Sequence, residues 1–236
     1  MNTPSYRRRL LRVSQSRPVV KICGNVYFED SLMVASARPD LMGWIFSPHS
    51  KRRVSIESAA RQIECIRREH PDIFHVAVCA GNSIPEILRI ARAIPGFDFV
   101  QIVDGPGVAS EMRTHLRKNM EVIPVLRVSS PIVDQDLSIV MPADWVILDA
   151  FSPHALGGTG IAFDTAWVQN VSHRYILAGG LTPANVRERL LNSGASGADV
   201  SSGVEAETGL RTGPGRKDPQ KVVSFIENVK AISFNR

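Results

Sequence analysis

Residues 174–203 read RYILAGGLTPANVRERLLNSGASGADVSSG and contain one complete repeat unit of the fold. The apolar run at 174–178 predicts a strand, and the run at 197–200 predicts a second one. The stretch between them, 183–193, has the length and the amphipathic pattern of a helix. A helix between two strands predicts that the strands are parallel, because their connection must cross back along the sheet.

The same alternation continues through the rest of the chain. Strands are predicted at 19–23, 42–47, 73–79, 97–103, 121–128, 144–149, 174–178 and 197–200. Helices are predicted at 28–38, 55–70, 84–94, 107–119, 132–141, 163–170, 183–193 and 218–231. Eight such units predict an α/β fold, a single (β/α)8 TIM barrel. A doubly wound open sheet is the alternative, but no GxGxxG motif follows the first strand, which argues against dinucleotide binding.

The net charge of +5 arises in the first eighteen residues and not from a basic surface. Five arginines and no acidic residue lie there, and the rest of the chain balances 23 basic against 23 acidic residues. We therefore expect no nucleic-acid partner. Residues 1–18 are predicted to be a basic, disordered N-terminal extension, with a transit peptide or a misassigned start codon as alternatives. Residues 19–236 are predicted to form the barrel domain.

Apolar runs and cysteines exclude further classes of protein. No apolar run approaches the ~20 residues that span a bilayer, so no membrane partner is expected. The three cysteines, Cys23, Cys65 and Cys79, form no CxxC motif and no metal-like cluster with the six histidines, so no metal is expected. A sparse, odd cysteine count is typical of a reducing compartment, and the cytoplasm is the predicted location.

Three glycine-rich segments follow the last three strands. They are LGGTG (156–160), AGGLTP (178–183) and DVSSGVE (199–205). Glycines let backbone N–H groups approach a ligand closely, and the last strands of a barrel commonly carry a phosphate site. Three adjacent loops of this kind therefore favour a phosphate-ester site, although glycines can also simply turn the chain.

Two strand ends carry candidate acid–base groups. Asp149 ends the strand in WVILDAF, where a carboxylate can act as a general acid or base, or can cap a turn. Val19, Lys21 and Cys23 share one face of the first strand by the period of two, so Lys21 could favour a Cys23 thiolate. Cys23 could also be an inert buried residue, and the spacing does not separate it from Cys79, which ends another strand.

With these residues in order, the chain resembles the phosphoribosylanthranilate isomerase family of tryptophan biosynthesis over roughly 19–232. The motifs are KICG (21–24), GWIFSPHSKRRVS (43–55), VQI (100–102), VILD (146–149), GGTG (157–160), FD (163–164), LAGGLTPANV (177–186), DVSSGVE (199–205) and KDPQKV (217–222).

The resemblance implies an Amadori rearrangement. N-(5-phosphoribosyl)anthranilate, an aminoaldose phosphate, would become 1-(2-carboxyphenylamino)-1-deoxyribulose 5-phosphate. It implies Cys23 as the general base and Asp149 as the general acid, without a metal or organic cofactor, in a monomer or homodimer. Substrate contacts are implied for Arg52, which would hold the ring carboxylate, and for Gln101 and Asp199. Backbone contacts to the phosphate are implied for Gly158, Gly160, Gly179, Gly180, Ser202 and Gly203.

Two departures from the family pattern affect these expectations. Val103 stands where the family commonly has a histidine, and the segment 205–218 is several residues longer than usual. The alternatives are a related sugar-phosphate barrel isomerase or epimerase, a non-catalytic binder of a phosphorylated ligand, and a fragment of a bifunctional enzyme.

Overall fold

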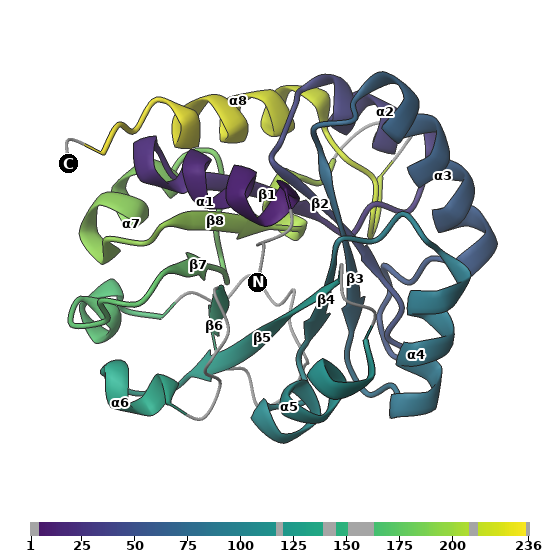
Figure 1. Ribbon diagram of the computed structural model, residues 1–236. Helices are drawn as coiled ribbons and strands as arrows, with labels where there is room; N and C mark the ends of the chain where they lie inside the picture. The colour runs from purple at the N-terminus through teal and green to yellow at the C-terminus, as the bar shows by residue number, and fades with distance from the viewer. Residues whose placement is uncertain (1–4, 117–119, 139–144, 151–162, 208–211, 235–236) are drawn as a thin grey trace.

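The computed structural model describes residues 5–116, 120–138, 145–150, 163–207 and 212–234. Eight parallel strands close into one barrel in the order of the sequence (Figure 1). They are β1 (Val19–Cys23), β2 (Leu41–Ile45), β3 (Phe74–Cys79), β4 (Phe99–Ile102), β5 (Glu121–Val128), β6 (Val146–Ala150), β7 (Tyr175–Leu177) and β8 (Gly197–Val200). The predicted (β/α)8 fold is confirmed.

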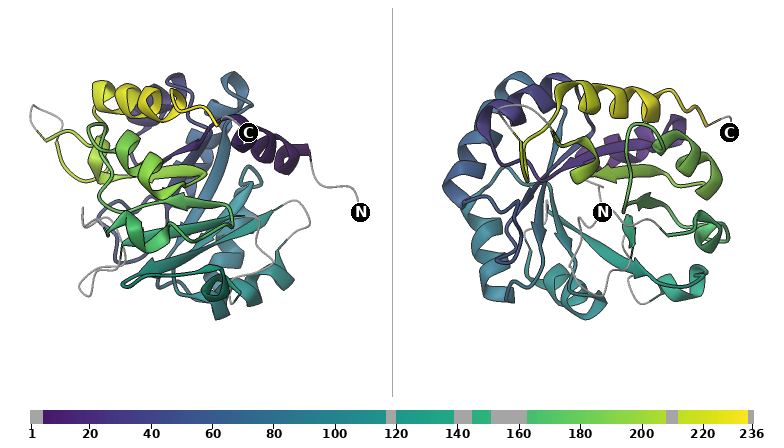
Figure 2. Two further views of the ribbon diagram at one scale, coloured as in Figure 1. Left: turned by 90° about the vertical axis from the view of Figure 1, so that its left-hand side faces the viewer. Right: turned by 180° about the vertical axis from the view of Figure 1, so that it is seen from behind.

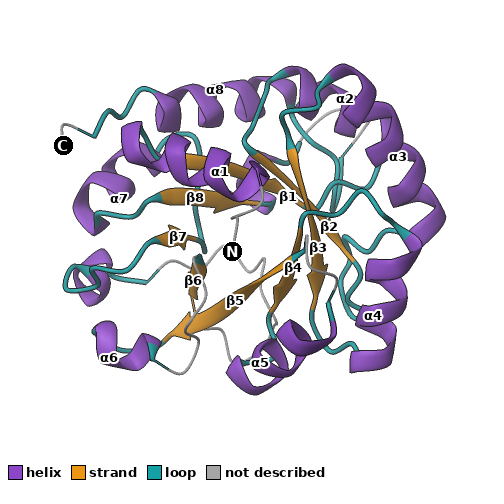
Figure 3. Ribbon diagram, viewed as in Figure 1, coloured by secondary structure: helices purple, strands orange, loops and turns teal. Residues whose placement is uncertain are grey.

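Helices surround the barrel, as the colours of Figure 3 show. Those that follow strands are α2 (Phe28–Ser36), α3 (Ile56–Glu69), α4 (Ile84–Ala93), α5 (Pro106–His115), α6 (Asp134–Leu137), α7 (Val186–Ser193) and α8 (Pro219–Lys230). Side-chain caps fix several starts: Ser55 accepts a hydrogen bond from the Ser58 N–H, and Asp218 accepts from Gln220 and Lys221.

Two expected helices are much shorter than predicted. The stretch 132–141 forms only the one-turn helix α6 among its described residues, and 163–170 forms only the 3₁₀ helix η1 (Thr165–Val168). Asp134 accepts hydrogen bonds from the backbone N–H of Ser172 and, at 3.3 Å, that of His173. These bonds connect the start of α6 to the segment before β7. The local sequence pattern does not predict this contact.

The N-terminal segment is a helix, α1 (Ser5–Ser16), where the sequence led us to expect a disordered extension. Leu10 is 1% exposed and Ser14 is also buried, which places one helical face against the barrel. Leu10 packs with the barrel-interior side chains Val19 and Leu41, near the starts of their strands. Figure 2 shows α1 at one end of the barrel, on the side of the N-terminus.

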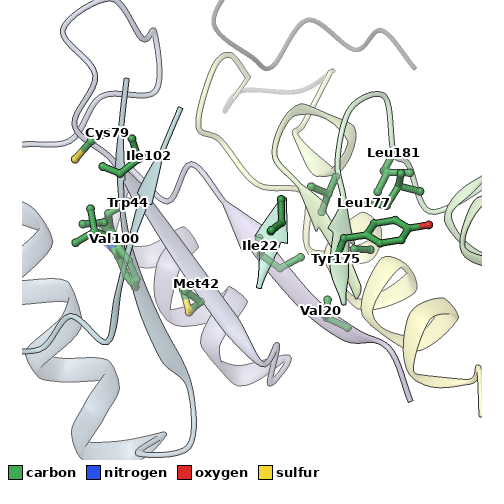
Figure 4. Close-up of a cluster of buried hydrophobic side chains, with 14 of the residues drawn as sticks. Val20, Ile22, Met42, Trp44, Cys79, Val100, Ile102, Tyr175, Leu177 and Leu181 are labelled. Atoms are coloured by element: carbon green, nitrogen blue, oxygen red, sulfur yellow. The ribbon is translucent and has the colours of Figure 1, made fainter. Parts of the chain in front are cut away.

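Strand side chains alternate between two buried layers. The layer between strands and helices contains Val20, Ile22, Met42, Trp44, Cys79, Val100, Ile102, Tyr175, Leu177 and Leu181 (Figure 4). The layer inside the barrel contains Cys23 together with apolar residues such as Val76 and Ile147. Cys23 therefore faces the barrel interior, whereas Cys79 faces the helices. No helix of the described residues is long and apolar enough to cross a membrane.

Candidate active site

A cavity of about 700 Å³ is lined by residues at the carboxyl ends of the strands. Its lining includes every predicted site residue that the structure describes: Cys23, Arg52, Gln101, Asp149, Gly179, Gly180, Asp199, Ser202 and Gly203. Gly158 and Gly160, the other two predicted phosphate contacts, lie outside the described residues. Parallel strands bring these positions together because all eight carboxyl ends meet at one rim.

Cys23 lies beside a buried ion pair. Lys21 is fully buried, and its Nζ donates to both carboxylate oxygens of Asp199 at 2.9 Å. Gly43 gives the thiol room, since a Cβ there would lie 2.9 Å from the Cys23 Sγ. Burial lowers the pKa of Lys21, but the attraction of Asp199 and Cys23 outweighs burial, so that this pKa is raised overall.

The resting thiol is neutral, contrary to the thiolate that the neighbouring lysine suggested. Burial raises the pKa of Cys23, and the ammonium groups of Lys21 and Lys217 offset this only in part because Asp199 opposes them. Ionisation of Cys23 therefore has to occur in the presence of a ligand or at high pH.

Asp149 is suited to carry a proton near neutral pH. It lies in β6 in register with Arg127 of β5. Burial raises the pKa of Asp149 to about 6, and the negative charge of Asp199 contributes in the same direction. A carboxyl group with this pKa can donate a proton at physiological pH, which is the property required of a general acid.

Arg52 lines the cavity but is already bound to a carboxylate. Its Nε donates to Glu205 Oε1 at 2.7 Å, and its Nη2 donates to Glu205 Oε2 at 2.8 Å. The sequence predicted Arg52 as a clamp for a substrate carboxylate, without any partner in the protein. Glu205 was overlooked as a separate residue, although it ends the DVSSGVE motif that the sequence brought forward.

The glycine loops approach the cavity with unusual backbone geometry. Gly179 and Gly180 have φ angles of +89° and +63°, which favour glycine. A Cβ on Gly203 would lie 1.8 Å from the Leu181 carbonyl oxygen, so the loops after β7 and β8 touch through this glycine. Both loops line the cavity.

Two other lining residues, Ser201 and His49, were not predicted as site residues from the sequence. Ser201 and His49 line the cavity, and Ser201 Oγ is buried without a hydrogen-bond partner among the described residues. Gln101 Oε1 is likewise buried and has no partner within the described part of the chain. Val103, the departure from the family pattern, also lines the cavity. Unpartnered buried oxygens are costly, so a ligand or water is expected to satisfy them.

No group of three or more His, Cys, Asp or Glu side chains is placed to hold a metal ion in the ranges that the structure describes. The cavity has acid–base groups and hydrogen-bond donors in its lining, on a closed barrel. These features define the class of (β/α)8-barrel enzymes that carry out acid–base chemistry at the carboxyl ends of their strands.

Comparison with known proteins specifies the class further. A family model described as N-(5'-phosphoribosyl)anthranilate (PRA) isomerase matches residues 20–228. The chain belongs to this family of isomerases. The N-(5'-phosphoribosyl)anthranilate isomerase of Geotalea uraniireducens is 37% identical over 216 residues, covering 90% of this chain and 98% of the relative. That of Leptospira interrogans is 34% identical over 221 residues, covering 93% and 98%.

Solved structures of the family have the same fold. Phosphoribosyl anthranilate isomerase from Thermus thermophilus superposes with a TM-score of 0.74 at 27% identity, covering 89% of this chain and 97% of that one. A phosphoribosyl anthranilate isomerase in complex with reduced 1-(o-carboxyphenylamino)-1-deoxyribulose 5-phosphate superposes with a TM-score of 0.69 at 27% identity, covering 91% and 100%.

Proposed function

We propose that this protein isomerises N-(5'-phosphoribosyl)anthranilate to 1-(2-carboxyphenylamino)-1-deoxyribulose 5-phosphate in tryptophan biosynthesis, with Asp149 as general acid and Cys23 as general base. One observation carries the assignment of these two roles. The two side chains come from β1 and β6, well separated around the barrel, and yet they line a single cavity. A small substrate in the cavity can therefore contact both groups at once.

The reaction needs one proton delivered and another removed. Asp149 donates its proton to the furanose ring oxygen, the C1–O bond breaks, and the anthranilate nitrogen forms a Schiff base with C1. Cys23 then removes the proton from C2, and the resulting enol becomes the C2 ketone when C1 gains a proton and the O2 hydroxyl loses one. The raised pKa of Asp149 supports the first step, because a carboxyl group of ordinary pKa is ionised at neutral pH.

The second step requires the thiolate form of Cys23. The cationic Schiff base that forms beside the thiol favours this ionisation, and it adds to the effect of the Lys21 and Lys217 ammonium groups. Lys217 is buried and donates to the Ser201 carbonyl oxygen at 2.9 Å, so its position is fixed. Ionisation of Cys23 is thereby coupled to the presence of the reactive intermediate.

Substrate binding is divided between the glycine loops and Arg52. The phosphate binds to backbone N–H groups of the glycine loops, including those of Gly179, Gly180 and Gly203, which line the cavity. The ring carboxylate binds Arg52, and the amide of Gln101 and the carboxylate of Asp199 contact the sugar hydroxyls. Arg52 comes from the loop after β2 and the glycines come from the loops after β7 and β8, and all of them line the same cavity.

An isomerase assay on purified protein with freshly made substrate tests this function. The wild type should convert the substrate to product, and turnover should be nearly lost in Cys23→Ala and in Asp149→Asn, each by ~10²–10⁴-fold in kcat. No turnover by the wild type would contradict the proposed reaction, and faster turnover of another aminoaldose phosphate would indicate the altered-substrate alternative. Val103 in the lining is the feature that favours such a shift in substrate range.

We also place the protein in the cytoplasm, as a monomer or a homodimer. The sparse and odd number of cysteines supports a reducing compartment. A Thermotoga maritima relative is described as a dimeric phosphoribosylanthranilate isomerase from which monomers were generated. Light scattering at several concentrations distinguishes the two states.

A further inference from the structure

Glu205 is held in a fixed position next to the cavity. It lies directly after the 3₁₀ helix η2 (Ser202–Val204) and is 8% exposed. Besides the two hydrogen bonds from Arg52, it accepts one from the Gly215 N–H at 2.8 Å and lies 3.5 Å from Lys217 Nζ. The carboxylate is therefore anchored by the far end of the long 205–218 segment.

This anchoring uses only one edge of the Arg52 guanidinium. A guanidinium has five N–H donors and can bind two carboxylates, one through Nε and Nη2 and one through Nη1 and Nη2. Glu205 occupies the first edge. Among the described residues, none accepts a hydrogen bond from Nη1, and Arg52 lines the cavity. The second edge therefore remains available to a ligand.

The local net charge is positive, which also favours the binding of a second anion. Arg52 and Lys217 together carry two positive charges against the single negative charge of Glu205. Burial raises the pKa of Glu205, but hydrogen bonds from Arg52 and the charge of Lys217 outweigh burial and keep this carboxyl group ionised. The cluster of Arg52, Lys217 and Glu205 thus keeps one net positive charge next to the cavity.

We propose that Glu205 is a positioning residue that holds the guanidinium of Arg52 by its inner edge, so that the outer edge binds the carboxylate of the substrate. This inference rests on the proposed function, because it assumes that the substrate carries a carboxylate opposite its phosphate. It predicts that Glu205 affects recognition of that carboxylate while taking no part in proton transfer.

The variant Glu205→Gln tests the role, since it keeps the shape of the side chain and removes the charge and one acceptor. For the anthranilate substrate, KM should rise about tenfold while kcat changes less than about twofold, as expected for a lost binding contact. For an aniline-derived substrate that lacks the carboxylate, both parameters should stay at the wild-type values. Glu207→Gln is the matched control, because Glu207 follows closely in the same segment and its side chain is 82% exposed.

Two further measurements separate positioning from a purely structural role. In the Arg52→Ala background, Glu205→Gln should not raise KM any further, because its effect passes through Arg52. Glu205→Asp, which keeps the charge but shortens the reach, should give an intermediate KM if Glu205→Gln fails to fold. Equal losses for the two substrates, or a full additional loss in the Arg52→Ala background, would overturn the inference.

The outcome is distinguishable from failure of the proposed function. If the wild type does not turn over, titration with reduced 1-(o-carboxyphenylamino)-1-deoxyribulose 5-phosphate replaces the kinetics. Binding by the wild type that weakens in Glu205→Gln, but not in Glu207→Gln, then supports the inference even though the reaction is absent. Absence of wild-type binding, or equal binding by both variants, overturns it.

Discussion

Replacing Asp149 with asparagine should abolish activity and yet stabilise the fold at neutral pH. The pKa of Asp149 is raised from 3.8 to about 6, so the folded protein holds this proton more tightly than the unfolded chain does. Each pKa unit is worth about 1.4 kcal/mol, and the ionised carboxylate therefore costs up to about 3 kcal/mol of unfolding free energy. Asparagine has the same shape and carries no charge, so it removes this cost.

The stabilisation should depend on pH in a defined direction. Below pH 3.8 the carboxyl group is protonated in both states and the cost is absent; it develops as the pH rises and is complete above about pH 6. Urea unfolding of wild type and Asp149→Asn at several pH values measures it. Glu227→Gln, at an exposed position of α8, should show no such change. An asparagine variant that is less stable than the wild type at pH 7.5, or a difference independent of pH, would refute the reasoning.

Three other substitutions have definite expected outcomes. Cys23→Ala should lose ~10²–10⁴-fold in kcat while still binding the reduced product, whereas Cys79→Ala, which faces the helices, should retain activity; equal losses in steady-state assays would contradict the assignment of the base. Gly203→Ala should weaken the binding of a phosphorylated ligand about tenfold or more. The new Cβ collides with Leu181, and the loop then loses hydrogen bonds to the phosphate. Calorimetry should find binding of the dephosphorylated analogue unchanged, and equal weakening would instead indicate a folding defect. Lys21→Met should cost about 3–5 kcal/mol of unfolding free energy, because it leaves a buried carboxylate unpaired; an unchanged urea midpoint would contradict this reasoning.

The fold was predictable because its signals are local and periodic. Apolar runs at the spacing of strands, alternating with amphipathic stretches, predicted the barrel, and the period of two correctly placed Lys21 and Cys23 on one face. The N-terminal helix was missed because a run of arginines predicts a solvated chain, whereas burial of Leu10 depends on a contact with strands that follow later. Local pattern does not contain such tertiary contacts.

The composition of the site was more predictable than its electrostatics. Strand ends and glycine motifs identified the lining residues, because the topology brings every strand end to one rim. The Arg52–Glu205 pair joins positions 153 residues apart, and nothing near either residue in the sequence indicates it. The neutral state of Cys23 could not be predicted from the sequence either, because burial raises the pKa of the thiol more than the lysine two residues away lowers it.

The neutral thiol of Cys23 has a consequence for the chemical durability of the protein. Peroxide and alkylating reagents attack thiolates, so a buried cysteine that stays protonated at rest reacts slowly even at the mouth of a cavity. Cys65 in α3 is more accessible to solvent. During storage or oxidative stress, damage should therefore accumulate first at Cys65, and the cysteine that we propose as the base should be among the last to be lost.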